Sequence, residues 1–183
     1  MRTLFAALVI VAVAGSAVAF DGGNTDKPQG PLSLYIAPDG TGTIANDGDT
    51  AFTFDGYSIA SASGAIVSDN WTSIPQIVED GGLGGGDDIG MSMLDSFSWA
   101  EMARSAELVS EAHLSALATV DAGYEFGIGD AFPTGTAAEL QDDLTFTYVD
   151  SSTDGSYEGA VVPEPATMSL LGLGALALIR RRR

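Results

Sequence analysis

Paired carboxylates are the side chains of this sequence that are best suited to chemistry. Clustered carboxylate and carbonyl oxygens on turns are the ligands that Ca²⁺ prefers. The pairs are Asp47 with Asp49, which follow Asn46 in NDGDT (residues 46–50), Asp87 with Asp88, and Asp142 with Asp143. None follows the spacing of an EF-hand loop, so a solvated turn is the simpler interpretation of each pair. Calcium at Asp47, Asp49, Asp87 and Asp88 is therefore a hypothesis, and no other cofactor is predicted.

Histidine and cysteine offer little catalytic chemistry. The sequence has no cysteine, which excludes thiol catalysis, disulfides and thiolate metal sites. A Ser-His-acid arrangement would need the single histidine, His113, as its base, but no G-x-S-x-G stretch accompanies it. Two acids suffice for glycoside hydrolysis, yet 24 of the 25 acids lie between residues 20 and 162, so pairs in sequence carry little information. We predict a protein that is not an enzyme, with a small glycosidase as the less favoured alternative.

Aromatic residues allow a second kind of site. Trp71, Trp99, Tyr35 and Tyr57 are candidates for a platform on which a sugar ring stacks. Aromatic side chains on alternating strands more often belong to the core. A carbohydrate-binding or calcium-binding module of an extracellular polysaccharide matrix stays open as an alternative function.

Charge is distributed very unevenly. The net charge is −18, but five of the seven basic residues lie at the two ends of the chain, so residues 20–162 carry a net charge of −22. These five are Arg2, Arg180, Arg181, Arg182 and Arg183. An acidic body repels phosphate backbones, and the clustered Lys and Arg that nucleic-acid binding needs are missing from it. Nucleic acid is therefore excluded as a partner.

The amino-terminal segment has the parts of a secretory signal peptide. Arg2 precedes the apolar run LFAALVIVAVAG, and the small residues Ala17 and Ala19 flank Val18. A positive start, a short apolar run and a small-x-small site predict cleavage by signal peptidase after Ala19.

The carboxyl-terminal segment also has three parts. Pro163, Glu164 and Pro165 precede fourteen uncharged residues, ATMSLLGLGALALI. Spanning a bilayer takes about 20 apolar residues, so this predicted transmembrane helix is short for permanent residence.

Four consecutive arginines form the third part and are the predicted topology signal: Arg180, Arg181, Arg182 and Arg183. Terminal positive charges keep that end in the cytoplasm while the body is exported. We therefore predict a transient inner-membrane intermediate.

Together these three parts, from Pro163 to Arg183, resemble the PEP-CTERM sorting signal of Gram-negative bacteria. The resemblance implies recognition by exosortase, a membrane-embedded protease, removal of the tail, and delivery to the cell surface or the extracellular matrix.

Alternating apolar residues predict strands in the body. They occur in LSLYIA, TIAND, GYEFGI, DLTFTYVD and SYEGAVV. The apolar phase changes at Asp55 and Gly56, which predicts a β-bulge. In SFSWAEMARSAELV, helix-favouring residues predict a helix that begins near Ser96.

The body is also similar to a β-sandwich module of planctomycete PEP-CTERM proteins, and more distantly to lamin-tail-type sandwiches. The similarity rests on FDGYSIASASG, NWTSI, ELVSE, AGYEFGIGDAF and DLTFTYV. It implies that AELVSE and LSALATV are strands, against their local propensity.

We therefore expect an all-β protein: a single β-sandwich, jelly-roll or immunoglobulin-like, with one short helical insertion. The predicted segments are a signal peptide (1–19), a flexible lead-in (20–31), the sandwich (32–162) and the sorting and anchor segment (163–183). The predicted function is that of an exported, non-enzymatic protein of the cell surface or extracellular matrix. Its expected partners are signal peptidase, exosortase, the inner membrane and extracellular polysaccharide.

Overall fold

Eleven strands make up about half of the described part of the computed structural model, which covers residues 27–79, 91–92, 99–114, 117–153 and 155–164. The strands are β1 (Gln29–Ile36), β2 (Gly42–Asn46), β3 (Phe52–Phe54), β4 (Gly56–Ser61), β5 (Met91–Ser92), β6 (Trp99–Arg104), β7 (Leu108–His113), β8 (Ala118–Val120), β9 (Glu125–Gly127), β10 (Leu144–Asp150) and β11 (Gly155–Pro163). The fold is thus mostly β, as predicted.

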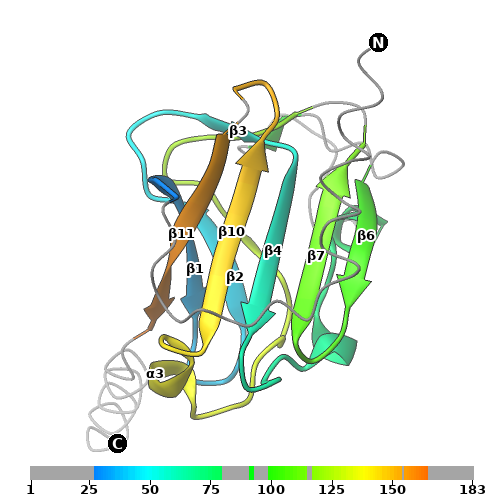
Figure 1. The fold of residues 1–183 in the computed structure, drawn as a ribbon, viewed down its shortest axis with the longest axis vertical. Coiled ribbons are helices and arrows are strands. Elements are labelled where there is room, and N and C mark those ends of the chain that lie inside the picture. Colours follow the sequence, from blue (N-terminus) through cyan, green and yellow to red (C-terminus); the bar gives the residue numbers. More distant parts are fainter. Residues whose placement is uncertain (1–26, 80–90, 93–98, 115–116, 154, 165–183) are drawn as a thin grey trace, which may run out of the picture.

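Eight strands form one strongly curved sheet in the order β6-β7-β4-β10-β11-β1-β2-β9, which resembles half of a barrel. In Figure 1, β11, β10, β4, β7 and β6 stand in front, and β1 and β2 pass behind them. A second sheet has three short strands in the order β3-β8-β5. Most pairs are antiparallel, but β1 and β11 are parallel neighbours.

Alternating apolar residues explain two of the strands near the centre of the large sheet, β1 and β10. In β1 the side chains of Leu32, Leu34 and Ile36 are fully buried, as their spacing predicts. Phe146 and Tyr148 of β10 are fully buried as well, and Thr147 between them faces the other side. The core therefore lies on the inner face of the curved sheet.

The predicted helix at Ser96 is wrong from Trp99 onward. Trp99 to Arg104 form β6, an edge strand that pairs with β7, while residues 93–98 lie outside the described part. Cross-strand pairing outweighs the helix propensity of WAEMAR because Trp99 is buried against Phe54 and His113. The strands implied by the family resemblance at AELVSE and LSALATV appear as β7 and β8.

The described helices lie elsewhere and are short. They are the 3₁₀ turn η1 (Ser68–Asn70), α2 (Ile74–Glu79) and α3 (Ala137–Leu140). Within the described ranges, no helix is long and apolar enough to cross a membrane.

The two terminal segments fall almost wholly outside the described ranges. The predicted signal peptide, with Ala17 and Ala19, lies outside them. Of the predicted sorting and anchor segment, only Pro163 and Glu164 are described. The residues of that segment predicted to set the topology therefore also lie outside: Arg180, Arg181, Arg182 and Arg183. The signal peptide, the transmembrane helix and the topology signal accordingly stay predictions.

The apolar phase changes at Asp55 because the chain passes there from the three-stranded sheet to the large sheet. The structure shows this passage in place of the predicted β-bulge. β3 ends at Phe54 in the three-stranded sheet, and β4 begins at Gly56 in the large sheet. Asp55 lies between them, with its N–H donating to the carbonyl of Val149 and its carbonyl accepting from the N–H of His113. The two apolar phases therefore serve two different sheets.

Both ends of the predicted sandwich extend further than expected. Gln29 to Pro31, predicted as part of a flexible lead-in, are the first residues of β1. Pro163, predicted to open the sorting segment, is the last residue of β11. The folded body and the sorting segment are thus continuous.

Candidate functional site

The carboxyl end of β11 carries the start of the predicted sorting segment. Pro163 is in register with Ile36 of β1, and the N–H of Glu164 donates a hydrogen bond of 2.8 Å to the carbonyl of Ile36. A proline has no N–H for a sheet ladder and is therefore tolerated at strand ends. The strand consequently ends at the motif, and one further residue is still attached to the sheet.

Close packing explains why β11 has this place in the sheet. Gly159 lies opposite Phe146, and a Cβ atom there would stand 2.3 Å from the Phe146 ring and 2.5 Å from the carbonyl oxygen of Leu32. Only glycine allows such an approach. Val161, two residues on, packs against the core. Gly159 therefore seats β11 between β10 and β1, and pairing with β1 together with Val161 holds the segment before Glu164.

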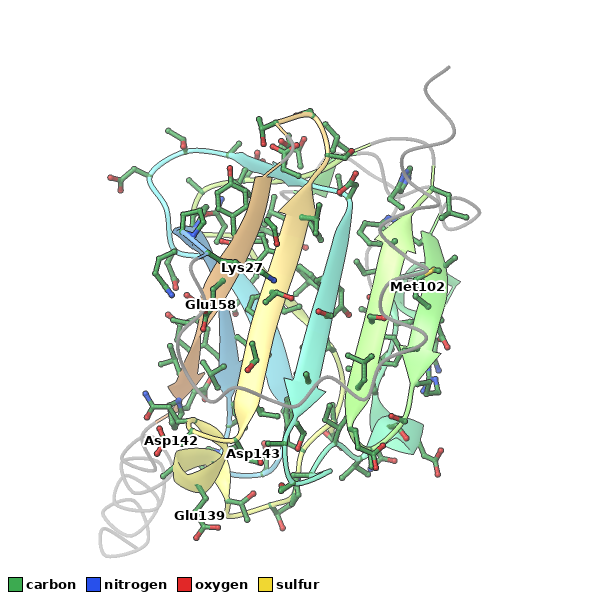
Figure 2. The ribbon with its side chains drawn as sticks, viewed as in Figure 1. Lys27, Met102, Glu139, Asp142, Asp143 and Glu158 are labelled. Carbon is green, nitrogen blue, oxygen red and sulfur yellow. The ribbon has the colours of Figure 1, made fainter. Side chains whose placement is uncertain are left out.

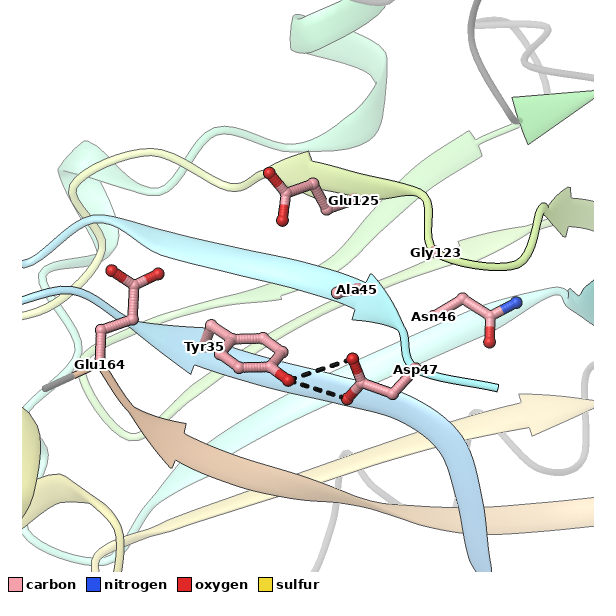
Figure 3. Close-up of a pocket in the computed structure, with 7 residues that line it drawn as sticks. All are labelled: Tyr35, Ala45, Asn46, Asp47, Gly123, Glu125 and Glu164. Carbon is pink, nitrogen blue, oxygen red and sulfur yellow. Dashed lines mark hydrogen bonds between the residues drawn. The ribbon is translucent and has the colours of Figure 1, made fainter. Parts of the chain in front are cut away.

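A pocket of about 280 Å³ lies beside Glu164 (Figure 3). Tyr35, Asp47 and Glu125 line it together with Glu164. The Tyr35 hydroxyl donates to both carboxylate oxygens of Asp47, at 3.1 Å each. Burial, the hydrogen bond to Asp47 and the negative charges of Asp47, Glu125 and Glu164 raise the pKa of Tyr35. The pocket is therefore anionic.

The predicted calcium ligands are only partly brought together. Asp47 lies in the acidic pocket, but Asp49 is an exposed residue that does not line it, and Asp87 and Asp88 lie outside the described part. Among the residues the structure describes, no three His, Cys, Asp or Glu side chains are arranged to hold a metal ion. Calcium binding stays a prediction, which thermal unfolding with EDTA and then with added Ca²⁺ would test.

The NDGDT turn owes its shape to Asn46, whose side chain is fully buried. Its amide group donates to the carbonyls of Thr50 (3.0 Å) and Val120 (2.9 Å), and its side-chain oxygen accepts from the N–H of Gly48 (2.9 Å). Buried polar groups cost little when they are fully hydrogen-bonded in this way. Asn46 is therefore a structural residue of the turn.

The adjacent acids Asp142 and Asp143 differ in role (Figure 2). Asp143 accepts hydrogen bonds from the Ser61 hydroxyl and from the N–H of Ser63 (2.8 Å), which ties the end of β4 to the start of β10. Asp142 is exposed. We expect Asp143→Ala to lower the free energy of unfolding by about 1–3 kcal/mol, because it removes the acceptor for two donors. Urea unfolding checks this, with Asp142→Ala as the matched control; equal losses in both variants would contradict the assignment.

Three of the four aromatic candidates are core residues, as the favoured interpretation of their positions expects, so they do not form a sugar platform. Trp71, Trp99 and Tyr57 are only 1%, 4% and 3% exposed. The Trp71 ring nitrogen donates to the Tyr57 hydroxyl at 3.3 Å, and the Arg104 guanidinium lies 4.6 Å from the centre of the Trp71 ring. Tyr35, in the acidic pocket, is the remaining candidate.

His113 occupies a structural position on β7. It is 7% exposed, and its ring meets that of Trp99 edge to face with the centroids 5.4 Å apart. Its backbone N–H donates to the carbonyl of Asp55, where the chain passes between the two sheets. These contacts support the structural interpretation of this residue.

Glu111 is the buried acid that the sequence did not single out. It is 1% exposed, and its carboxyl oxygens accept from the N–H of Ile74, the first residue of α2, at 2.9 and 3.2 Å. Burial above all, opposed by hydrogen bonds from Tyr57 and Ile74, raises the pKa of Glu111 to about 8. The signal for it was alternation: once AELVSE is taken as a strand, Glu111 falls on the inward face with Val109.

A perturbed carboxyl is a candidate catalytic acid when it faces a cleft. Glu111 instead lies under α2 and does not line the pocket described above. Its contacts with Ile74 and Tyr57 join α2 to β4 and β7. We assign it a structural role.

The comparisons with known proteins concern the carboxyl end. Residues 161–183 match the family model of the PEP-CTERM protein-sorting motif, which confirms the predicted resemblance. The match begins within β11 and includes Pro163 and Glu164, whose backbones are attached to β1. It ends with the arginine cluster, Arg180, Arg181, Arg182 and Arg183. No curated protein and no solved structure matches the chain. The chain therefore carries a PEP-CTERM sorting signal at its carboxyl end, and this motif implies export, processing by exosortase and sorting to the cell surface.

Proposed function

We propose that the mature protein is a non-enzymatic component of the cell surface or the extracellular matrix, exported through an inner-membrane intermediate and released by exosortase. The observation that carries this proposal is the sorting motif at residues 161–183, which continues directly from the last strand of a folded β body. The body is the cargo, and the tail determines where it is delivered.

Three acids with well-defined hydrogen bonds support a non-enzymatic body because they serve the fold. Glu111 joins α2 to the large sheet, and Asp143 fastens the loop after β4. Asp150 accepts from the N–H and hydroxyl of Ser152 and from the hydroxyl of Thr53, which fixes the turn after β10. Each of these acids has a structural use.

The negative charge of the body supports delivery by the sorting signal and not by adhesion of the body to the membrane. Figure 2 shows Glu139 of α3, Asp142 and Asp143 at the end of the body where β11 terminates, and Glu164 follows that strand. Anionic lipid headgroups repel such an end. Once the tail is removed, the body has no electrostatic reason to remain at the membrane.

The curved sheet also supports the β-sandwich predicted for residues 32–162. Leu34 from β1 and Phe146 from β10 belong to one core on its inner face, and the three-stranded sheet adds Phe54 to the same core. We infer a sandwich-type module whose two sides are largely one bent sheet.

Joint replacement of the four terminal arginines by glutamine tests the sorting proposal; the changes are Arg180→Gln, Arg181→Gln, Arg182→Gln and Arg183→Gln. We expect the variant to accumulate with its tail attached, because the terminal positive charges hold that end in the cytoplasm while the tail is presented. Mass spectrometry of the protein from its host, after fractionation into membrane and surface material, measures the outcome.

Arg104→Gln is the control for this change, since Arg104 is a body residue paired with Glu101. We expect this variant to lose its tail as the wild type does. Wild-type protein that retains Arg183 would contradict the proposal.

The carbohydrate-binding alternative is a separate prediction about the body. Tyr35 is the candidate aromatic that remains outside the core. Binding on a glycan array that is lost in Tyr35→Ala would favour this alternative over a passive matrix component.

A further inference from the structure

We propose that the sorting cut falls on the carboxyl side of Glu164, so that the mature protein keeps Pro163 and Glu164 as the end of β11. This inference rests on the proposed sorting function and adds where the body ends. It follows from how the start of the motif is held by the fold.

β11 is an interior strand of the large sheet. It pairs with β10 from Gly155 to Gly159, and with β1 at Glu158 and from Ala160 to Pro163. Gly159 is pressed between Phe146 and the backbone of Leu32. A cut within this strand would leave part of the β1 ladder without its partner.

The backbone remains attached through the first two motif residues. Pro163 is in register with Ile36, and the Glu164 N–H is bonded to the Ile36 carbonyl at 2.8 Å. A protease that binds an extended peptide uses the same backbone groups that pair strands. Up to the N–H of Glu164 those groups are occupied by β1, so cleavage there would first require the strand to be withdrawn.

The side chain of Glu164 is held differently from its backbone. It is exposed at the acidic pocket, beside Asp47 and Glu125, while only its N–H takes part in the sheet. The sorting enzyme thus meets an accessible carboxylate on a backbone that the sheet holds up to the N–H of Glu164, the last residue that the structure describes.

The first test is the end of the mature protein itself. Chymotrypsin cuts after Tyr157, and residues 158–164 contain no further aromatic or leucine residue, so one peptide that begins at Glu158 reports the end. We expect this peptide to include Glu164. A peptide that ends at Pro163 or earlier would overturn the inference.

The second test locks β11 to β1. Tyr35 and Val162 are register partners, and the chain has no cysteine of its own, so Tyr35→Cys with Val162→Cys places a single disulfide across the two strands. The matched control is Ser58→Cys with Thr147→Cys, which locks β4 to β10 and leaves β11 untouched. We expect both oxidised proteins to lose the tail to the same extent as wild type.

Selective failure of the first lock would show that β11 must leave the sheet before processing, and would overturn the inference. If that lock does not form, the terminal peptide decides alone. Tail removal with loss of Glu164 overturns this inference and leaves the sorting proposal intact, whereas a chain that still ends at Arg183 overturns both.

Discussion

Glu111→Gln is expected to remove much of the pH dependence of the free energy of unfolding on the alkaline side of pH 5. In the folded protein the carboxyl group has a pKa of about 8, against 4.5 in a free side chain. The native state therefore keeps a proton that the unfolded chain releases, and stability falls as the pH rises through this interval. The contribution of the protonated carboxyl is complete below pH 4.5 and lost by pH 8.

The expected loss is large because the group is almost fully buried. A difference in pKa of this size corresponds to about 5 kcal/mol over the whole interval, and to about 3 kcal/mol between about pH 5.5 and pH 9. The groups that face it are the Tyr57 hydroxyl from β4, the Ile74 N–H from α2, and the charges of Glu101 and Arg104 from β6. Burial outweighs the hydrogen bonds and the positive charge, which act in the opposite direction.

Urea unfolding at a series of pH values measures this effect, and the difference between wild type and variant isolates Glu111 from the general self-repulsion of an acidic protein. Glu107→Gln is the control, because Glu107 is an exposed acid on the turn before the same strand. Parallel curves for wild type and Glu111→Gln would show that the buried carboxyl is not held protonated.

Phe146→Ala is expected to lower the free energy of unfolding by about 3–5 kcal/mol, the usual cost of removing a buried aromatic ring. Phe146 is fully buried on β10, with ring contacts to Tyr57 and Tyr148. Its ring also lies over Gly159 of β11. Relaxation is therefore restricted, because the backbones on both sides belong to the sheet, and the cavity stays open.

Thr145→Ala is the matched control for this change, since Thr145 is the preceding residue of the same strand and points to the opposite face. Its loss is expected to stay within about 0.5 kcal/mol, as for most substitutions away from the core. Similar losses in the two variants, measured by chemical unfolding, would contradict the assignment of the core to the inner face of the sheet.

The sequence predicted those strands whose side chains alternate without interruption. β1 and β10 follow from the spacing of Leu32, Leu34 and Ile36, and of Phe146 and Tyr148, because a sheet with one buried face requires that period. β6 was not predictable from its own residues. Ala, Glu and Met favour a helix, and only pairing with β7 makes WAEMAR a strand.

The sorting motif of the candidate site was predictable from the sequence, but the acidic pocket around it was not. Pro163 and Glu164 form a linear pattern that a sequence displays directly. The acidic pocket is assembled from Tyr35, Asp47 and Glu125, which come from separate strands and turns, and adjacency in sequence says nothing of such a set. Glu111 was hidden because the residues that precede it favour a helix, which obscures the alternation of its strand.

The parallel pairing of β1 with β11 orders the events of export in time. Gln29 emerges among the first residues of the body and Pro163 among the last, yet they belong to neighbouring strands. Contacts between such distant segments form late in folding. If the body is exported with its amino end first, β11 can pair with β1 only after the whole body has crossed the membrane. An enzyme that cuts beyond Glu164 therefore acts on a finished body and not on a chain still in transit.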